Sequence, residues 1–240
     1  MSHRTTTSPA VRSLAAALAR LNARHPWSHN DHFHGWVLRR LPRRRRAALD
    51  VGCGLGGLVA ALAGRFDRVD AIDADPAAAR WAAQRFASDG RVSVREASFG
   101  DVRVPAGVGG YDLVTMVAVL HHLDLVPALE HARGLLAPGG RLLVVGLARV
   151  ATRRDVAVDL VSAFANPVVG LVKHPRAVRP TGGDVRPDAD DASSAAPPVV
   201  VRDATETVDE IAAAARTVLP GARVRRRLFF RYTLEWTAPR

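Results

Sequence analysis

Residues 48–56, Ala-Leu-Asp-Val-Gly-Cys-Gly-Leu-Gly, decide the fold of this 240-residue chain. The apolar start predicts a short buried strand, and the alternating glycines allow positive φ angles and a close approach of the backbone to a ligand. A helix-forming segment, residues 58–65, follows directly. A strand, a glycine loop and a helix in this order are typical of a nucleotide-cofactor site. Gly52, Gly54 and Gly57 also fit the dinucleotide pattern G-x-G-x-x-G, so the glycines alone leave the cofactor open.

Two acidic residues separate the candidate cofactors. At a strand end, Asp50 would repel the pyrophosphate of a dinucleotide by several kcal/mol at about 4 Å in a partly desolvated site. S-adenosylmethionine instead carries a sulfonium and an ammonium, and Asp50 could accept a hydrogen bond from the ammonium, worth about 1.5–3 kcal/mol. Asp73 ends a second strand-like segment and is placed to accept from both ribose hydroxyls. The predicted S-adenosylmethionine contacts here are Asp50, Gly52, Cys53, Gly54, Gly56, Asp73 and Ala74.

Two further segments fit one protein family in chain order. Residues 111–123 read Tyr-Asp-Leu-Val-Thr-Met-Val-Ala-Val-Leu-His-His-Leu, and residues 135–145 read Leu-Leu-Ala-Pro-Gly-Gly-Arg-Leu-Leu-Val-Val. With the glycine loop and Asp73, they make residues 48–147 resemble the class I S-adenosylmethionine-dependent methyltransferases. The resemblance implies a Rossmann-like fold, S-adenosyl-L-methionine as cofactor and S-adenosyl-L-homocysteine as product.

The resemblance also suggests roles for residues that follow later strands. His121 and His122 follow the fourth strand, where an imidazole that titrates near neutral pH can act as a base, and His122 is the favoured one. Ser98 stands where the family usually carries an aspartate that accepts from the adenine amino group, and Phe99 is expected to pack against the adenine ring. The cofactor contacts implied after these strands are Ser98, Phe99, Met116 and Val117.

The hydrophobic pattern indicates an α/β fold. Strand-like segments near 47–51, 68–73, 91–95, 112–117 and 141–147 alternate with helix-like ones, which predicts a doubly wound, mostly parallel sheet with helices on both faces. A closing helix over 205–218 and a C-terminal antiparallel hairpin over 223–236 complete the prediction. We expect four parts: a basic helical cap (1–46) with a helix over 33–41, the cofactor-binding core (47–148), an insertion or lid with a Pro/Asp/Ala-rich loop (149–202), and the closing helix and hairpin (203–240).

Residues 26–34, Pro-Trp-Ser-His-Asn-Asp-His-Phe-His, precede the first strand. Their histidines and aspartate are residue types that bind metal ions, but the spacing matches no recognised ligand set. We therefore expect no metal here. Small-molecule members of the resembled family often close their site with an N-terminal helical segment. Trp27, His29 and His34 are therefore expected to cap the cofactor or to line the substrate site.

The net charge of +11 is concentrated at the two ends of the chain. Residues 1–46 carry ten arginines and one acid, and residues 222–240 carry six arginines and one acid. The arginines at 39–46 could bind phosphates, an acidic small molecule or a membrane surface. However, Lys173 is the only lysine, and a general bias toward arginine explains the charge without a partner. Binding to nucleic acid therefore remains possible but is not favoured.

The composition of the chain bears on disulfide bonds, membrane segments and cellular location. Cys53 is the only cysteine, so no internal disulfide forms, and its place in the glycine loop indicates a small filler rather than a nucleophile. No apolar stretch reaches the ~18 residues that span a bilayer, and the start of the sequence lacks a signal region. We expect a cytoplasmic protein; the sequence leaves its oligomeric state open.

Three functions remain in play. The leading one is a methyltransferase that acts on a small-molecule acceptor at oxygen, nitrogen or carbon. The alternatives are an RNA or protein methyltransferase that uses the basic ends, and a non-catalytic protein that binds S-adenosylmethionine. Residues 116–119 read Met-Val-Ala-Val rather than the Asn-Pro-Pro-Tyr of amino-group methylators of adenine or glutamine, so that reaction is not expected.

Overall fold

The computed structural model describes residues 29–151, 204–228 and 231–240. Its strands are β1 (Ala47–Val51), β2 (Arg68–Asp73), β3 (Val92–Glu96), β4 (Tyr111–Val117), β5 (Leu136–Leu147), β6 (Arg223–Arg227) and β7 (Arg231–Thr237). Its helices are α2 (His29–Leu38), α3 (Gly57–Ala63), α4 (Pro76–Arg85), α5 (Leu125–Leu135) and α7 (Val208–Val218), with 3-10 turns η1 (Phe99–Asp101) and η2 (Leu120–His122).

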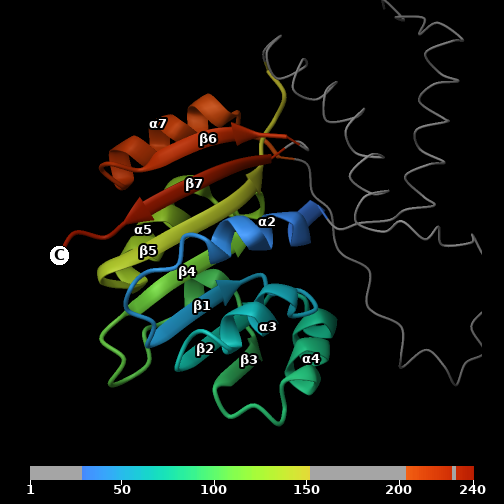
Figure 1. The fold of residues 1–240 in the computed structure, drawn as a ribbon. Helices are drawn as coiled ribbons and strands as arrows, with labels where there is room; N and C mark the ends of the chain where they lie inside the picture. The colour runs from blue at the N-terminus through green and yellow to red at the C-terminus, as the bar shows by residue number, and fades with distance from the viewer. Residues whose placement is uncertain (1–28, 152–203, 229–230) are drawn as a thin grey trace, which may run out of the picture.

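The described strands form one sheet in the order β3-β2-β1-β4-β5-β7-β6 (Figure 1). Neighbouring strands from β3 to β5 are parallel, whereas β7 runs antiparallel to both β5 and β6. This arrangement confirms the predicted doubly wound, mostly parallel sheet that ends in an antiparallel hairpin. The strand order reverses between β1 and β4, which places the topological switch point beside the glycine loop.

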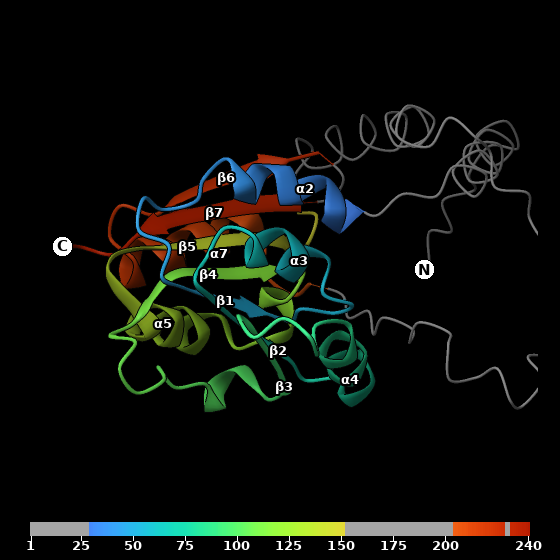
Figure 2. The ribbon, with the colours of Figure 1, turned by 60° about the horizontal axis from the view of Figure 1, so that its bottom comes forward.

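Helices cover both faces of the sheet, as Figure 2 shows from a second direction. Successive residues of a strand point to opposite faces, so Ala48 packs with α2, α3 and α4 while Leu49 packs with α5 and α7. Both residues are fully buried, as are Leu142 and Leu143, which divide in the same way in β5. The near-continuous apolar runs of β1, β4 and β5 therefore follow from burial on two sides.

The structure corrects the bounds of two predicted helices. The helix expected over 33–41 is α2, His29–Leu38, because the chain already turns at Arg40, whose N–H donates to the Val37 carbonyl at 2.9 Å. The helix expected over 205–218 begins at Val208, because Thr207 has an extended backbone and caps it. The expected insertion, apart from its first three residues, lies outside the described residues.

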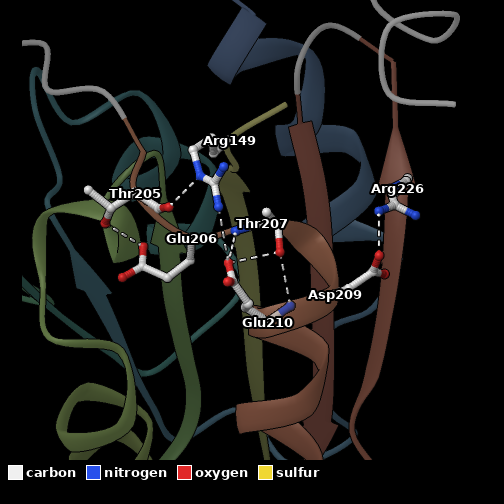
Figure 3. Close-up of polar contacts among 7 residues, drawn as sticks. All are labelled: Arg149, Thr205, Glu206, Thr207, Asp209, Glu210 and Arg226. Carbon is white, nitrogen blue, oxygen red and sulfur yellow. Dashed lines mark hydrogen bonds and ion pairs between the residues drawn. The ribbon is translucent and has the colours of Figure 1, made fainter. Parts of the chain in front are cut away.

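The carboxyl end of β5 and the start of α7 are joined by polar contacts (Figure 3). Arg149 donates its backbone N–H to the Glu206 carbonyl at 2.7 Å and its Nε to the Thr205 carbonyl at 2.9 Å. Thr207 and Glu210 form a capping box, in which the Thr207 Oγ1 accepts from the Glu210 N–H at 3.2 Å and the Thr207 N–H donates to the Glu210 carboxylate at 2.7 Å. Segments far apart in the sequence are thus fixed side by side at the carboxyl edge of the sheet.

The capping box should contribute measurably to stability. Replacing a threonine N-cap by alanine leaves helix N–H groups unsatisfied, so we expect Thr207→Ala to lower the free energy of unfolding by about 1 kcal/mol. Urea unfolding followed by circular dichroism measures the change. Thr217→Ala is the matched control, because Thr217 is exposed on the same helix and donates only to the Ala213 carbonyl. Equal losses in the two variants would contradict a special role for the cap.

Candidate functional site

The candidate site lies at the carboxyl edge of the sheet, where β1, β2 and β4 end. The glycine loop follows β1, Asp73 is the last residue of β2, and η2 follows β4. In doubly wound sheets, ligands generally bind at the carboxyl edge where the strand order reverses, which here is between β1 and β4. The fold therefore brings the sequence-predicted residues of three separate segments to one edge.

The glycine loop needs its glycines for different reasons. Gly52 has φ +68°, and a Cβ there would lie 2.2 Å from Cγ2 of Val119, so the loop after β4 packs directly on the loop after β1. Gly56 has φ +76°, and a Cβ there would lie 2.6 Å from the Phe86 ring. Gly54 also has a positive φ, +52°, but no atom lies within 4 Å of its would-be Cβ. The open side of the loop is therefore at Gly54, where a ligand can approach the backbone.

Asp73 supports the glycine loop, and its carboxylate can still accept further hydrogen bonds. Its Oδ2 accepts from the Gly54 N–H at 2.8 Å, and its Oδ1 accepts from the Asp75 N–H at 2.9 Å. A carboxylate has about four lone-pair positions, so these two bonds leave both oxygens able to accept again. The side chain is half-buried beside the open side of Gly54. This geometry suits a ligand that offers a pair of hydroxyl groups.

Asp50 is a carboxylate buried without a counter-charge. It is 2% exposed, and its Oδ1 accepts from the Thr115 hydroxyl at 2.7 Å. Burial raises the pKa of Asp50 to about 7, against the lowering effect of the Thr115 hydrogen bond, and the charge of Asp73 raises it further. Among the described residues no basic side chain pairs with Asp50. A cationic ligand group at this edge would supply the missing charge, so the donor set fits an ammonium-bearing cofactor and not a diphosphate.

The remaining loop and strand-end residues differ in accessibility. Cys53 is buried, and burial raises the pKa of its thiol above the usual range, which is the setting of an inert filler. Ala74 and Ser98 are exposed, and the Ser98 hydroxyl makes no hydrogen bond within the described residues. Val117, at the end of β4, is half-buried.

Two predicted contacts have their side chains in the core. Met116 is fully buried in the cluster that includes α5 and α7. Phe99 is 6% exposed, and its ring meets that of His131 edge-on, with centroids 4.8 Å apart. The ring of Phe99 therefore offers little surface to an adenine, and Met116 could meet a ligand only through its backbone.

His121 and His122 lie in η2, directly after β4. Their ring centroids are 4.0 Å apart with planes inclined by 39°. His121 is buried and His122 is half-buried, so His122 is the more accessible of the two to a substrate. The structure places the pair at the carboxyl edge of the sheet.

The expected N-terminal cap lies only partly within the described residues. Trp27 lies outside the described residues, and His29 is the first residue of α2. His34 is half-buried on α2, a helix that packs Phe33, Trp36 and Val37 against the sheet. The described residues contain no group of three or more acidic, histidine or cysteine side chains suited to a metal. Nor is any helix within the described ranges long and apolar enough to cross a membrane.

Three residues of the site went unrecognised in the sequence. Thr115 holds Asp50, Val119 packs on Gly52, and Ala118 has a left-handed φ of 59° while its N–H donates to the Val145 carbonyl at 2.7 Å. A polar residue in an otherwise apolar strand was a signal for Thr115. The strain at Ala118 has no sequence signal, since alanine rarely adopts this conformation, and it marks the turn out of β4 as fixed by its surroundings.

The raised pKa of Asp50 predicts a pH dependence of stability. In the unfolded chain Asp50 ionises near its ordinary pKa of 3.8, and in the folded protein near 7. Between these values the folded state holds the extra proton, so rising pH weakens folding by up to about 1.4 kcal/mol per pH unit from this group. Urea unfolding at several pH values should show this fall in the wild type relative to Asp50→Asn. Parallel curves for the two proteins would contradict a buried, high-pKa carboxyl.

Known proteins similar to this chain are methyltransferases. A model of the methyltransferase domain matches residues 49–142. An uncharacterized methyltransferase of Mycobacterium tuberculosis is 31% identical over 218 residues, which cover 89% of this chain and 98% of that protein. A ubiquinone biosynthesis O-methyltransferase of Thiobacillus denitrificans is 32% identical over 106 residues, 44% of this chain and 46% of that protein.

Among solved structures, the fold is similar to that of a SAM-dependent methyltransferase from Aquifex aeolicus. The TM-score is 0.52 at 15% sequence identity, and the match covers 93% of this chain and 97% of the other. The relative that matches almost the full chain, the matched domain and the shared fold point to one family. The chain belongs to the class I S-adenosylmethionine-dependent methyltransferases.

Proposed function

We propose that this chain binds S-adenosylmethionine at the carboxyl edge of the sheet and transfers the methyl group to a small-molecule acceptor. The observation that carries the proposal is the buried carboxylate of Asp50, which has no counter-charge among the described residues, beside the open side of the glycine loop. A cation compensates such a group, whereas a diphosphate would add to the repulsion. The ubiquinone-pathway relative, named as an O-methyltransferase, supports a small acceptor.

Each residue then has a defined task. Asp73 accepts hydrogen bonds from the ribose hydroxyls with its unused lone pairs, while its present bonds keep the loop in place. Asp50 accepts from the ammonium group, directly or through water, and Thr115 favours its ionised form. The exposed hydroxyl of Ser98 accepts from the adenine amino group, in place of the family's usual aspartate.

The reaction depends mainly on the alignment of the two reactants and on the exclusion of water from the site. Bound S-adenosylmethionine would supply a sulfonium methyl group, whose carbon the lone pair of an acceptor attacks in line while the carbon–sulfur bond breaks and S-adenosylhomocysteine leaves. The protein holds the two partners in that alignment and excludes water, which lowers the entropic part of the barrier. Where the acceptor carries a proton, a ring nitrogen of His122 takes it, beside the ring of His121 at a centroid distance of 4.0 Å.

The placement of charge favours a small acceptor over a nucleic acid. Arg43–Arg46 precede β1, whereas the candidate site follows it, so the length of the strand separates the two, about 17 Å for five residues. The hairpin arginines at 223, 225 and 227 belong to β6. This strand forms one edge of the sheet, and β2 lies near the other edge. Among the described residues, no arginine of either basic end is hydrogen-bonded to the glycine loop.

Release of S-adenosylhomocysteine from S-adenosylmethionine, measured over a panel of phenols, quinols, carboxylates and amines, tests the proposal. We expect at least one small acceptor to support turnover. His122→Gln should slow it about a hundredfold or more with an acceptor that must lose a proton, and should leave cofactor affinity unchanged. Turnover with RNA or protein and with none of the small molecules would overturn the small-acceptor assignment. Cofactor binding without turnover on any acceptor would identify a non-catalytic protein.

A further inference from the structure

A cavity of about 350 Å³ lies at the edge of the sheet opposite the candidate site. Four segments form it: the loop before β1 and the end of β7, which belong to the two basic ends of the chain, and the first residues of β4 and β5. In Figures 1 and 2 the C-terminus and the loop between α2 and β1 lie at the same end of the molecule. The lining residues are Pro42, Arg43, Arg44, Asp112, Pro138, Gly139, Arg141, Thr237, Ala238 and Arg240.

The lining is strongly positive, with four arginines against one aspartate. Arg44 pairs with Asp112, and Arg141 donates to the Arg40 carbonyl at 2.8 Å and lies 3.8 Å from a Glu235 oxygen. Arg43 and Arg240 make no hydrogen bond or ion pair within the described ranges of the chain. The cavity therefore has two guanidinium groups whose charge the described structure does not neutralise.

Asp112 fixes the arginine loop in place. This carboxylate is 1% exposed and accepts from Arg44 Nε at 2.5 Å and from the backbone N–H of Arg46 at 2.7 Å. Arg44 also donates through Nη2 to the Pro138 carbonyl at 3.3 Å, which ties the loop to the start of β5. The backbone of the loop that carries Arg43 is therefore fixed before any ligand arrives, so ordering this loop costs no further conformational entropy on binding.

We propose that this cavity binds the phosphate group of a small anionic ligand, with Arg43 and Arg240 as its main contacts. Guanidinium groups recognise phosphate oxygens in a bidentate way, and unpaired ones are available for this. The volume lies at the lower end of the range of about 300–1,000 Å³ for small-molecule sites, which suits a terminal phosphate or diphosphate. The core of the sheet lies between this cavity and the glycine loop, so the site is independent of the cofactor and of the proposed reaction.

Calorimetric titration of inorganic pyrophosphate into the full chain, at about 0.15 M ionic strength, tests the proposal. We expect saturable binding that falls about tenfold or more in the double variant Arg43→Gln/Arg240→Gln. Arg216→Gln is the matched control: Arg216 is exposed on α7 and does not line the cavity, so its loss should leave binding unchanged. S-adenosylhomocysteine affinity should be the same in all these proteins, which separates this site from the cofactor site.

Three outcomes would overturn the proposal. They are the absence of pyrophosphate binding, equal binding by the wild type and the double variant, and equal losses in the double variant and Arg216→Gln. A uridine octamer serves as the polymer probe. If the octamer binds with a steep salt dependence and pyrophosphate does not, the basic edge recognises a nucleic acid backbone instead, and the small-anion site is wrong.

Discussion

The burial of Asp50 at the point where the strand order reverses is the constraint on which the site depends. Ionising a carboxylate away from water is costly, and among the described residues only the Thr115 hydroxyl donates a hydrogen bond to Asp50 to offset that cost. Burial therefore raises the pKa of Asp50 to about 7, although the Thr115 hydrogen bond lowers it. A protein that keeps such a group at a ligand-facing strand end gains when a cation binds there. This electrostatic demand supports our proposal that a sulfonium- and ammonium-bearing cofactor binds beside Asp50.

The two edges of the same sheet have opposite chemistry. The carboxyl edge carries Asp50 and Asp73 beside a glycine loop, and the amino edge carries an arginine loop held by Asp112. The buried layers on the two faces of the sheet separate these edges. The net charge of the chain is therefore a poor guide to its cofactor site, because most of the basic residues described lie elsewhere.

Much of the fold was predictable because the signals are local. The apolar runs of β1, β4 and β5 indicated buried parallel strands, and Asp50 and Asp73 could be placed near strand ends from their positions beside such segments. The pairing of Asp50 with Thr115 was not predictable, since it depends on the β1–β4 register between residues 65 apart. The left-handed turn at Ala118 likewise arises from packing between loops.

The direction in which side chains point also limited how much of the site could be predicted from the sequence. Met116 shares the α5 face with Val114 two residues earlier, a relation that strand alternation allows one to infer once the bounds of β4 are known. Phe99 is buried by His131 of α5, a contact that no local pattern indicates. The shift of α2 toward the N-terminus had no clear local signal, because proline marks only the latest point at which a helix can end.

The most direct test of the cofactor assignment is calorimetric titration of S-adenosylmethionine, S-adenosylhomocysteine and NAD into the wild type and Asp73→Asn. Asp89→Asn serves as a control, because Asp89 precedes β3 at the opposite edge of the sheet and pairs with Arg91. The structure predicts binding of the first two ligands, a loss of about tenfold or more in Asp73→Asn alone, and no binding of NAD. Binding of NAD, or S-adenosylmethionine binding that ignores Asp73, would contradict the assignment.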